Sequence, residues 1–132
     1  MTVLVDSDVL IDCLRATPEA LVWLRASRAD GLLVPGIVAL EVLAGCRNRR
    51  EQGQVRKFLA RFPVVWPEAR EGAAAMAIYL EHGLAHGTGI LDSMVAAMAI
   101  GRGLRLLTFN LRHYRAVEGL DAAEPYPRPP AV

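Results

Sequence analysis

Two aspartates, Asp6 and Asp8, directly follow the apolar run 3–5, and a second apolar run begins at Val9. This pattern predicts a buried strand that passes into a helix, with both carboxylates at the carboxyl end of the strand. In open α/β sheets, ligands bind at that edge. The two charges therefore indicate a site, whereas Asp12, one helical turn further on, is expected on the helix exterior or in an ion pair.

Two more acids stand alone in apolar surroundings. Glu41 is the only charged residue in 31–46, and Asp92 is the only formally charged residue in 82–101. A single such acid is explained by a helix cap or a buried ion pair with Arg. Three acids from separate segments, Asp6 included, indicate instead that they converge, because carboxylates withdrawn from water are costly unless they are paired or bound to metal.

The chemistry of this acid set is that of a divalent cation site. Hard oxygen ligands without Cys or His spacing favour Mg²⁺, with Mn²⁺ as the alternative, over Zn²⁺. Such a cation activates a water molecule and neutralises charge on phosphoryl oxygens, so the protein need not supply a nucleophile. The sequence contains no G-x-S-x-G motif that would provide one.

Further polar groups follow the apolar stretch 104–107, which is predicted to be a strand. Thr108 offers a hydroxyl there and Asn110 an amide, although a helix cap or turn explains Asn110 equally well. Ser7, between the two aspartates, is a supporting candidate and a possible helix cap. A lone histidine such as His113 is more often a surface or packing residue than part of a site.

Four short strands alternating with helices are expected to position these groups. The strands are predicted at 2–5, 32–34, 64–66 and 104–108, and the helices at 7–14, 18–29, 37–46, 47–61, 68–84, 91–100 and 111–117. This order predicts an α/β fold: a three-layer α/β/α sandwich around a central, mainly parallel sheet. One domain is expected at 1–124, followed by a proline-rich, mobile arm at 125–132.

Composition bounds the function classes. Of the 132 residues, 53% are hydrophobic, which excludes a disordered chain. The net charge is only +1, so the overall charge does not attract the protein to a strongly charged partner. There is neither a basic leader nor an uninterrupted apolar span of 18 residues. We therefore expect a cytoplasmic protein without a membrane segment, with Cys13 and Cys46 as reduced thiols.

The segments that carry these acids resemble the PIN domain, and more closely the VapC toxins of type II toxin–antitoxin systems. The resemblance rests on VLVDSDVLI at 3–11, LEVLAG at 40–45, LDSMVAA at 91–97 and LTFN at 107–110. It implies an α/β/α fold and Mg²⁺- or Mn²⁺-dependent endoribonuclease activity.

The resemblance also assigns roles within the site. Asp6, Glu41 and Asp92 match the first three metal-binding acids of the family, and they are the expected catalytic and metal-binding residues. Asn110 replaces the fourth acid, so one negative charge of the family pattern is missing. Asp8 partly offsets this loss if it faces the cleft.

The family further implies RNA as substrate, a homodimer, and a cognate VapB-type antitoxin in a heterotetramer or larger complex. The antitoxin's C-terminal segment is expected in a groove between the second helix and helix 37–46. Arg47, Arg49 and Arg50 open a basic segment, 47–61, that could grip RNA or an acidic antitoxin. A solvated helix face explains the same charges.

Two alternative hypotheses for the function remain open. Asp6 and Asp8 after a strand also fit the opening motif of haloacid dehalogenase-like phosphatases, but the only lysine is Lys57 and no acidic pair follows Asp92. The second alternative is a catalytically weak PIN-like module that binds RNA or protein without cutting it. The replacement of the fourth acid by Asn110 favours this alternative.

Overall fold

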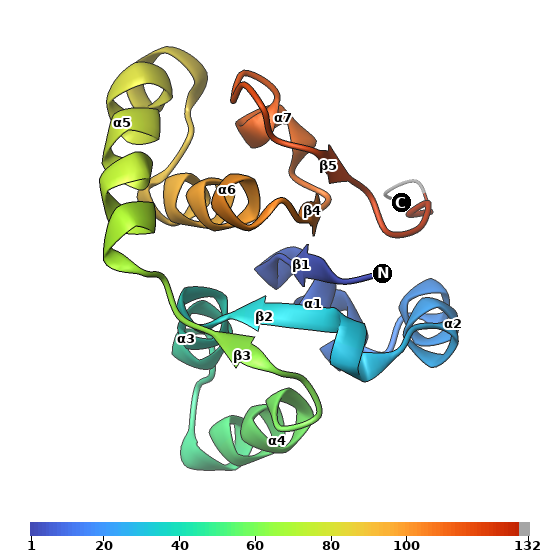
Figure 1. The fold of residues 1–132 in the computed structure, drawn as a ribbon. Coiled ribbons are helices and arrows are strands. Elements are labelled where there is room, and N and C mark those ends of the chain that lie inside the picture. The colour runs from blue at the N-terminus through green and yellow to red at the C-terminus, as the bar shows by residue number, and fades with distance from the viewer. Residues whose placement is uncertain (130–132) are drawn as a thin grey trace.

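The computed structural model describes residues 1–129, and its centre is a sheet of five parallel strands in the order β3-β2-β1-β4-β5 (Figure 1). The strands are β1 (Val3–Val5), β2 (Leu32–Pro35), β3 (Val64–Val65), β4 (Arg105–Leu107) and β5 (Ala122–Ala123). The predicted α/β fold with a parallel sheet is confirmed. The strand β5 was not predicted, because two alanines carry no β-branched or aromatic pattern.

Helices connect successive strands. They are α1 (Ser7–Leu14), α2 (Pro18–Ala26), the 3₁₀ turn η1 (Ala29–Gly31), α3 (Gly36–Ala44), α4 (Arg49–Leu59), α5 (Ala69–His86), α6 (Ile90–Arg102) and α7 (Leu111–Tyr114). Helices α5 and α6 lie side by side at one end of the molecule (Figure 1). Helix α5 continues past Leu84, where the sequence predicted its end, to His86, and Gly87 follows with a φ of 70° that only glycine adopts readily.

The order of the strands fixes where a site can form. The chain runs from β1 outward to β2 and β3, and then returns to the other side of β1 to add β4 and β5. Between β1 and β4 the strand order reverses, and a crevice opens at the carboxyl ends of such a strand pair. The register pairs Val5 with Leu107, and the Asp6 amide donates to the Leu107 carbonyl at 3.0 Å. The residues that follow both strands therefore lie together.

The first strand is anchored in the apolar core. Leu4 and Val5 are fully buried, as are Leu106 of β4 and Met98 of α6. Because a close-packed core leaves its strands little freedom, the backbone at Asp6 is held rigidly.

The tail differs from the mobile arm that the sequence predicted. Tyr126 and Arg128 both bond to Asp12 of α1, and Tyr126 packs against Trp23 and Phe109. Composition predicted mobility because four prolines dominate the segment, but the aromatic and basic residues between them find partners on the domain. The last part of the predicted arm, 130–132, lies outside the described residues.

Two expectations concern the chain as a whole. Cys13 and Cys46 are both free thiols, as predicted. Within residues 1–129, no helix combines the length and the apolar character that crossing a bilayer would need.

Candidate active site at the carboxyl ends of β1 and β4

Asp6 occupies the junction between β1 and α1. Its Oδ1 accepts the Ser7 amide at 2.8 Å and caps the helix, which satisfies one of the free amides of the first turn. Its Oδ2 accepts the hydroxyl of Thr108, which follows β4, at 2.9 Å. Asp6 is 7% exposed, so the acid predicted to anchor the site is more buried than the other predicted site acids, Asp8, Glu41 and Asp92.

Tyr114 connects Asp6 to Asp92. Its hydroxyl lies 3.0 Å from Asp6 Oδ2 and 3.1 Å from Asp92 Oδ1, and its ring is buried. The single phenolic proton can bond only one carboxylate at a time, so the other acid remains free to accept from elsewhere. Tyr114 was not among the predicted site residues. Its position four residues after Asn110, within α7, was the only sequence feature that could have indicated it.

Asp92 stands in the first turn of α6, as predicted. Its Oδ2 accepts the Gly89 amide at 3.1 Å, and His113 Nδ1 lies 3.2 Å from the same oxygen. His113 Nδ1 also contacts the amide nitrogen of Asn110. His113, which the sequence did not count as a ligand, thus lies between Asp92 and Asn110: with Nδ1 protonated it donates to Asp92, and with Nδ1 unprotonated it accepts from the side-chain amide of Asn110.

Asp8 faces the same place as Asp6. Its Oδ2 accepts the Phe109 amide at 3.0 Å and lies 3.4 Å from the Thr108 hydroxyl. Its Oδ1 is buried without a hydrogen-bond partner among the described residues. A buried carboxylate oxygen without a donor is costly, so this atom marks a place where a cation or a water molecule is favoured.

Glu41 enters the site from α3, and here one prediction is wrong. The sequence suggested a carboxylate withdrawn from water, but Glu41 is exposed. Helix α3 buries Val38 and Val42 and leaves Leu40, itself apolar, 55% exposed beside Glu41. The apolar neighbours that suggested burial therefore belong partly to the surface.

These residues surround one open cleft of about 320 Å³. Its lining consists of Asp6, Ser7, Asp8, Glu41, Asp92, Phe109, Asn110 and Arg128. All three acids of the predicted metal set lie on its wall, together with the supporting candidates Ser7, Asp8 and Asn110. Thr108 is fully buried beneath them and bonds to Asp6.

Burial sets the electrostatics of the cleft. Desolvation, and then the charge of nearby Asp8, raises the pKa of Asp6 from 3.8 to about 6, although the donors from Ser7, Thr108 and Tyr114 oppose the shift. Desolvation also raises the pKa of Asp8, and the charge of Arg128 works against that rise. Burial and the two neighbouring carboxylates hold the pKa of Tyr114 far above its usual range, so the hydroxyl stays protonated.

The donor set fits a hard divalent cation. Within residues 1–129, no three His, Cys, Asp or Glu side chains already converge into a metal-binding group. Mg²⁺ does not require such a group, because it keeps several waters and takes one or two carboxylates. The Oδ1 of Asp8 lacks a donor, and burial followed by the charge of Asp8 raises the pKa of Asp6, so both ionised carboxylates carry a cost that a cation would relieve.

The basic candidates lie outside this cleft. Arg47 pairs with Glu51, with Nη2 at 2.9 Å from Oε1, and lines a neighbouring groove of about 690 Å³ that also reaches Glu41. Arg49 and Arg50 are exposed on the first turn of α4 and line neither cavity. The groove is formed by α1, α3 and α4, whereas the sequence had placed α2 beside α3.

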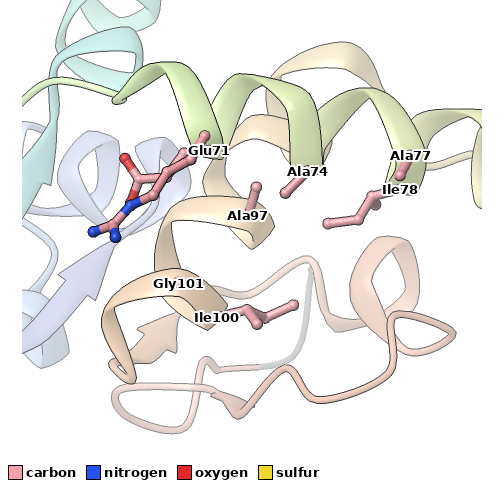
Figure 2. A pocket seen from close by; sticks show the side chains of 8 residues that line it. Glu71, Ala74, Ala77, Ile78, Ala97, Ile100 and Gly101 are labelled. Atoms are coloured by element: carbon pink, nitrogen blue, oxygen red, sulfur yellow. The ribbon is translucent and has the colours of Figure 1, made fainter.

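A third cavity, of about 480 Å³, lies between α5 and α6 and is lined mainly by small apolar residues (Figure 2). Its only carboxylate, Glu71, is buried and forms an ion pair with Arg102, with Nε at 2.8 Å and Nη2 at 2.9 Å. Both charges are therefore satisfied by one another. Arg70 also lines this cavity, and its Nε lies 3.1 Å from Glu68 Oε2, so each charged lining residue has an oppositely charged partner.

Comparison with known proteins places the chain in a family. The family model of the PIN domain matches residues 3–119. The chain is 36% identical over 121 residues to Ribonuclease VapC10 of Mycobacterium tuberculosis, across 89% of this chain and 90% of that protein. Among solved structures, it resembles a chain of the DNA-bound VapBC of Salmonella typhimurium, with a TM-score of 0.81, 22% identity and coverage of 96% and 99%. A toxin–antitoxin complex from Klebsiella pneumoniae gives a TM-score of 0.77 at 22% identity, with coverage of 95% and 98%. These two structures share its fold, and the family match together with the VapC10 relative shows that the chain belongs to the PIN-domain family.

Proposed function

We propose that this protein is a metal-dependent endoribonuclease that hydrolyses RNA phosphodiester bonds. The observation that carries the proposal is one cleft, at the point where the strand order reverses, that is lined by Asp6, Asp8 and Asp92. Thr108 contacts the first two of these acids, and Tyr114 links Asp6 to Asp92. Membership of the PIN-domain family and a relative named as a ribonuclease support the same chemistry.

In this proposal, Asp6, Glu41 and Asp92 hold Mg²⁺, or Mn²⁺ in its place. Bound there, the cation would lower the pKa of a water molecule and neutralise charge on the scissile phosphate. Tyr114 and Thr108 hold the Asp6 carboxylate in place, while Gly89 and His113 orient Asp92. Asp8 supplies the negative charge that Asn110 lacks.

We also propose that the chain acts as the toxin of a VapBC-type pair. The solved complexes that it resembles include toxin–antitoxin assemblies, which supports a VapB-type antitoxin as partner. The groove between α1, α3 and α4 adjoins Glu41 and exposes apolar side chains, so it is the proposed seat of the antitoxin segment. A homodimer, a heterotetramer or larger complex with antitoxin, and a cytoplasmic location follow from the same proposal.

The domain division belongs to the proposal as well. Residues 1–124 would form the nuclease domain, since β5 ends at Ala123, and 125–132 would be an appended tail. Arg49 and Arg50, exposed on α4, together with Arg47 remain proposed contacts for RNA or antitoxin.

Metal titration separates this function from a PIN-like module that binds without cutting. Mn²⁺ binding, measured by calorimetry, should be present in the wild type and lost in Asp6→Asn and Asp92→Asn. Asp30→Asn is the matched control, because Asp30 is exposed and precedes β2 at the opposite end of the sheet. An Asp6→Ala protein that cleaves tRNA or rRNA with Mg²⁺ as fast as the wild type would refute the site.

A further inference from the structure

A second charged cluster joins the tail to α1. Asp12 is 7% exposed and accepts Arg128 in two places, from Nε to Oδ2 at 3.2 Å and from Nη2 to Oδ1 at 3.1 Å. The Tyr126 hydroxyl donates to Asp12 Oδ2 at 3.0 Å. A buried carboxylate that receives a bidentate guanidinium and a phenol fixes the tail strongly to the domain.

The guanidinium of Arg128 is held from a second side. It lies over the ring of Phe109, with its central carbon 3.8 Å from the ring centroid, close enough for a cation–π interaction. Phe109 directly follows Thr108 in the chain, and the Phe109 backbone amide donates to Asp8. The ring that holds the Arg128 guanidinium therefore belongs to a residue whose backbone forms part of the carboxylate cleft.

Arg128 also lines that cleft, and it is the only basic side chain among the lining residues. The ion pair with Asp12 occupies Nε and Nη2, while Nη1 has no acceptor within residues 1–129. The side chain remains 43% exposed. A preoriented cation with free N–H groups thus stands beside a cluster of carboxylates.

This placement has a chemical consequence for an anionic substrate. A phosphodiester that enters a cleft of four acids meets repulsion that one bound divalent cation only partly cancels. Arginine suits a phosphate oxygen because its planar donors are fixed and always charged. Resting on the proposed ribonuclease function, we propose that Arg128 contacts a phosphate of the RNA substrate in the cleft, and that Asp12 is the positioning residue that holds it there.

RNA binding without cleavage tests the contact directly. Anisotropy of a labelled single-stranded RNA, measured in EDTA from 50 to 200 mM KCl in an Asp6→Asn background, gives the slope of log K against log salt. Each phosphate contact to a single strand contributes about −0.7 to that slope. Arg128→Gln should therefore make the slope shallower by about 0.7, and Arg128→Lys, which keeps the charge, should restore most of it.

Arg28 supplies a matched control. It makes the same two-point ion pair with Asp30, at 3.3 and 3.2 Å, but at the surface before β2. Arg28→Gln should leave the slope unchanged. Asp12→Asn should weaken RNA binding while Arg128 is still present, and thermal unfolding of each variant shows whether lost binding reflects lost folding.

The outcomes are separable. An unchanged slope in a folded Arg128→Gln protein would overturn the inference, and so would tighter RNA binding, which would make Arg128 a competitor of the substrate. If the slope changes as expected but the wild type does not cleave RNA with Mg²⁺ or Mn²⁺, the proposed function fails and the phosphate contact stands.

Discussion

Replacing Asp6 with Asn should stabilise the metal-free protein at neutral pH. Asp6 is 7% exposed, and burial together with the charge of Asp8 raises its pKa to about 6. Ionisation at neutral pH therefore costs free energy in the folded state that the unfolded chain does not incur. Asparagine removes the charge and keeps the Oδ1 acceptor for the Ser7 amide, so the helix cap survives. The Thr108 and Tyr114 hydroxyls, which donate to Asp6 Oδ2, keep alternative acceptors in Asp8 and Asp92.

The size of the effect follows from linkage. The difference between the ordinary aspartate pKa of 3.8 and the pKa of about 6 for Asp6 corresponds to about 3 kcal/mol of unfolding free energy at pH 7.5. A raised carboxyl pKa means that the folded state binds more protons, so the stability of the wild type falls as pH rises from 3.8 through about 6. The advantage of Asp6→Asn should thus shrink to about 1.5 kcal/mol at pH 5 and to about 0.5 kcal/mol at pH 4.

Urea unfolding in EDTA at those three pH values measures the effect. Asp30→Asn, a change at an exposed ion pair, should shift stability by about 0.5 kcal/mol or less at every pH. Mn²⁺ at one hundred times its dissociation constant should add about 2.7 kcal/mol to the wild type and nothing to Asp6→Asn. If Asp6→Asn is less stable than the wild type in EDTA at pH 7.5, the account of a desolvated carboxylate beside a second negative charge is wrong.

Three further predictions concern the same network and its surroundings. Tyr114→Phe removes a donor to Asp6, so the pKa of Asp6 should rise further and Mn²⁺ binding at pH 6.5, measured by calorimetry, should weaken more than at pH 8. In the wild type, Mn²⁺ binding should release protons near pH 6, seen as a dependence of the calorimetric heat on the buffer, because bound Asp6 must be ionised. Glu71→Gln leaves Arg102 without its charge partner and should cost about 3 kcal/mol in urea unfolding, while RNA cleavage by the folded fraction stays unchanged.

The sequence predicted the parts of the site that lie next to regular structure. Asp6 follows a strand with a clear apolar pattern, and Asp92 opens a helix, so both were found from local patterns. The exposure of Glu41 was not predictable, because it depends on which side of α3 meets α1 and α4. Such packing is a property of the whole fold, and apolar residues such as Leu40 also occur on surfaces.

The contacts of the C-terminal tail were also not predictable from local sequence patterns. Its prolines predict a mobile arm, and nothing local indicates that Arg128 reaches Asp12, more than one hundred residues earlier in the chain. A buried Asp12 needs a partner, but the sequence does not say which of its arginines provides it. Only the placement of β5 beside β4 brings the tail back across α1.

The acids of the cleft differ in how firmly the fold holds them and in how much their burial costs. Asp6 and Asp8 are fixed by β1, α1 and the Phe109 amide, and they carry the desolvation cost. Glu41 is exposed on α3, and its carboxylate has no hydrogen-bond partner among the described residues that would hold it in one position. Glu41 would therefore have to be ordered from solvent when it helps Asp6 and Asp92 to hold a cation. Glu41→Gln should accordingly leave stability in EDTA unchanged yet weaken metal binding, which sets it apart from Asp6→Asn.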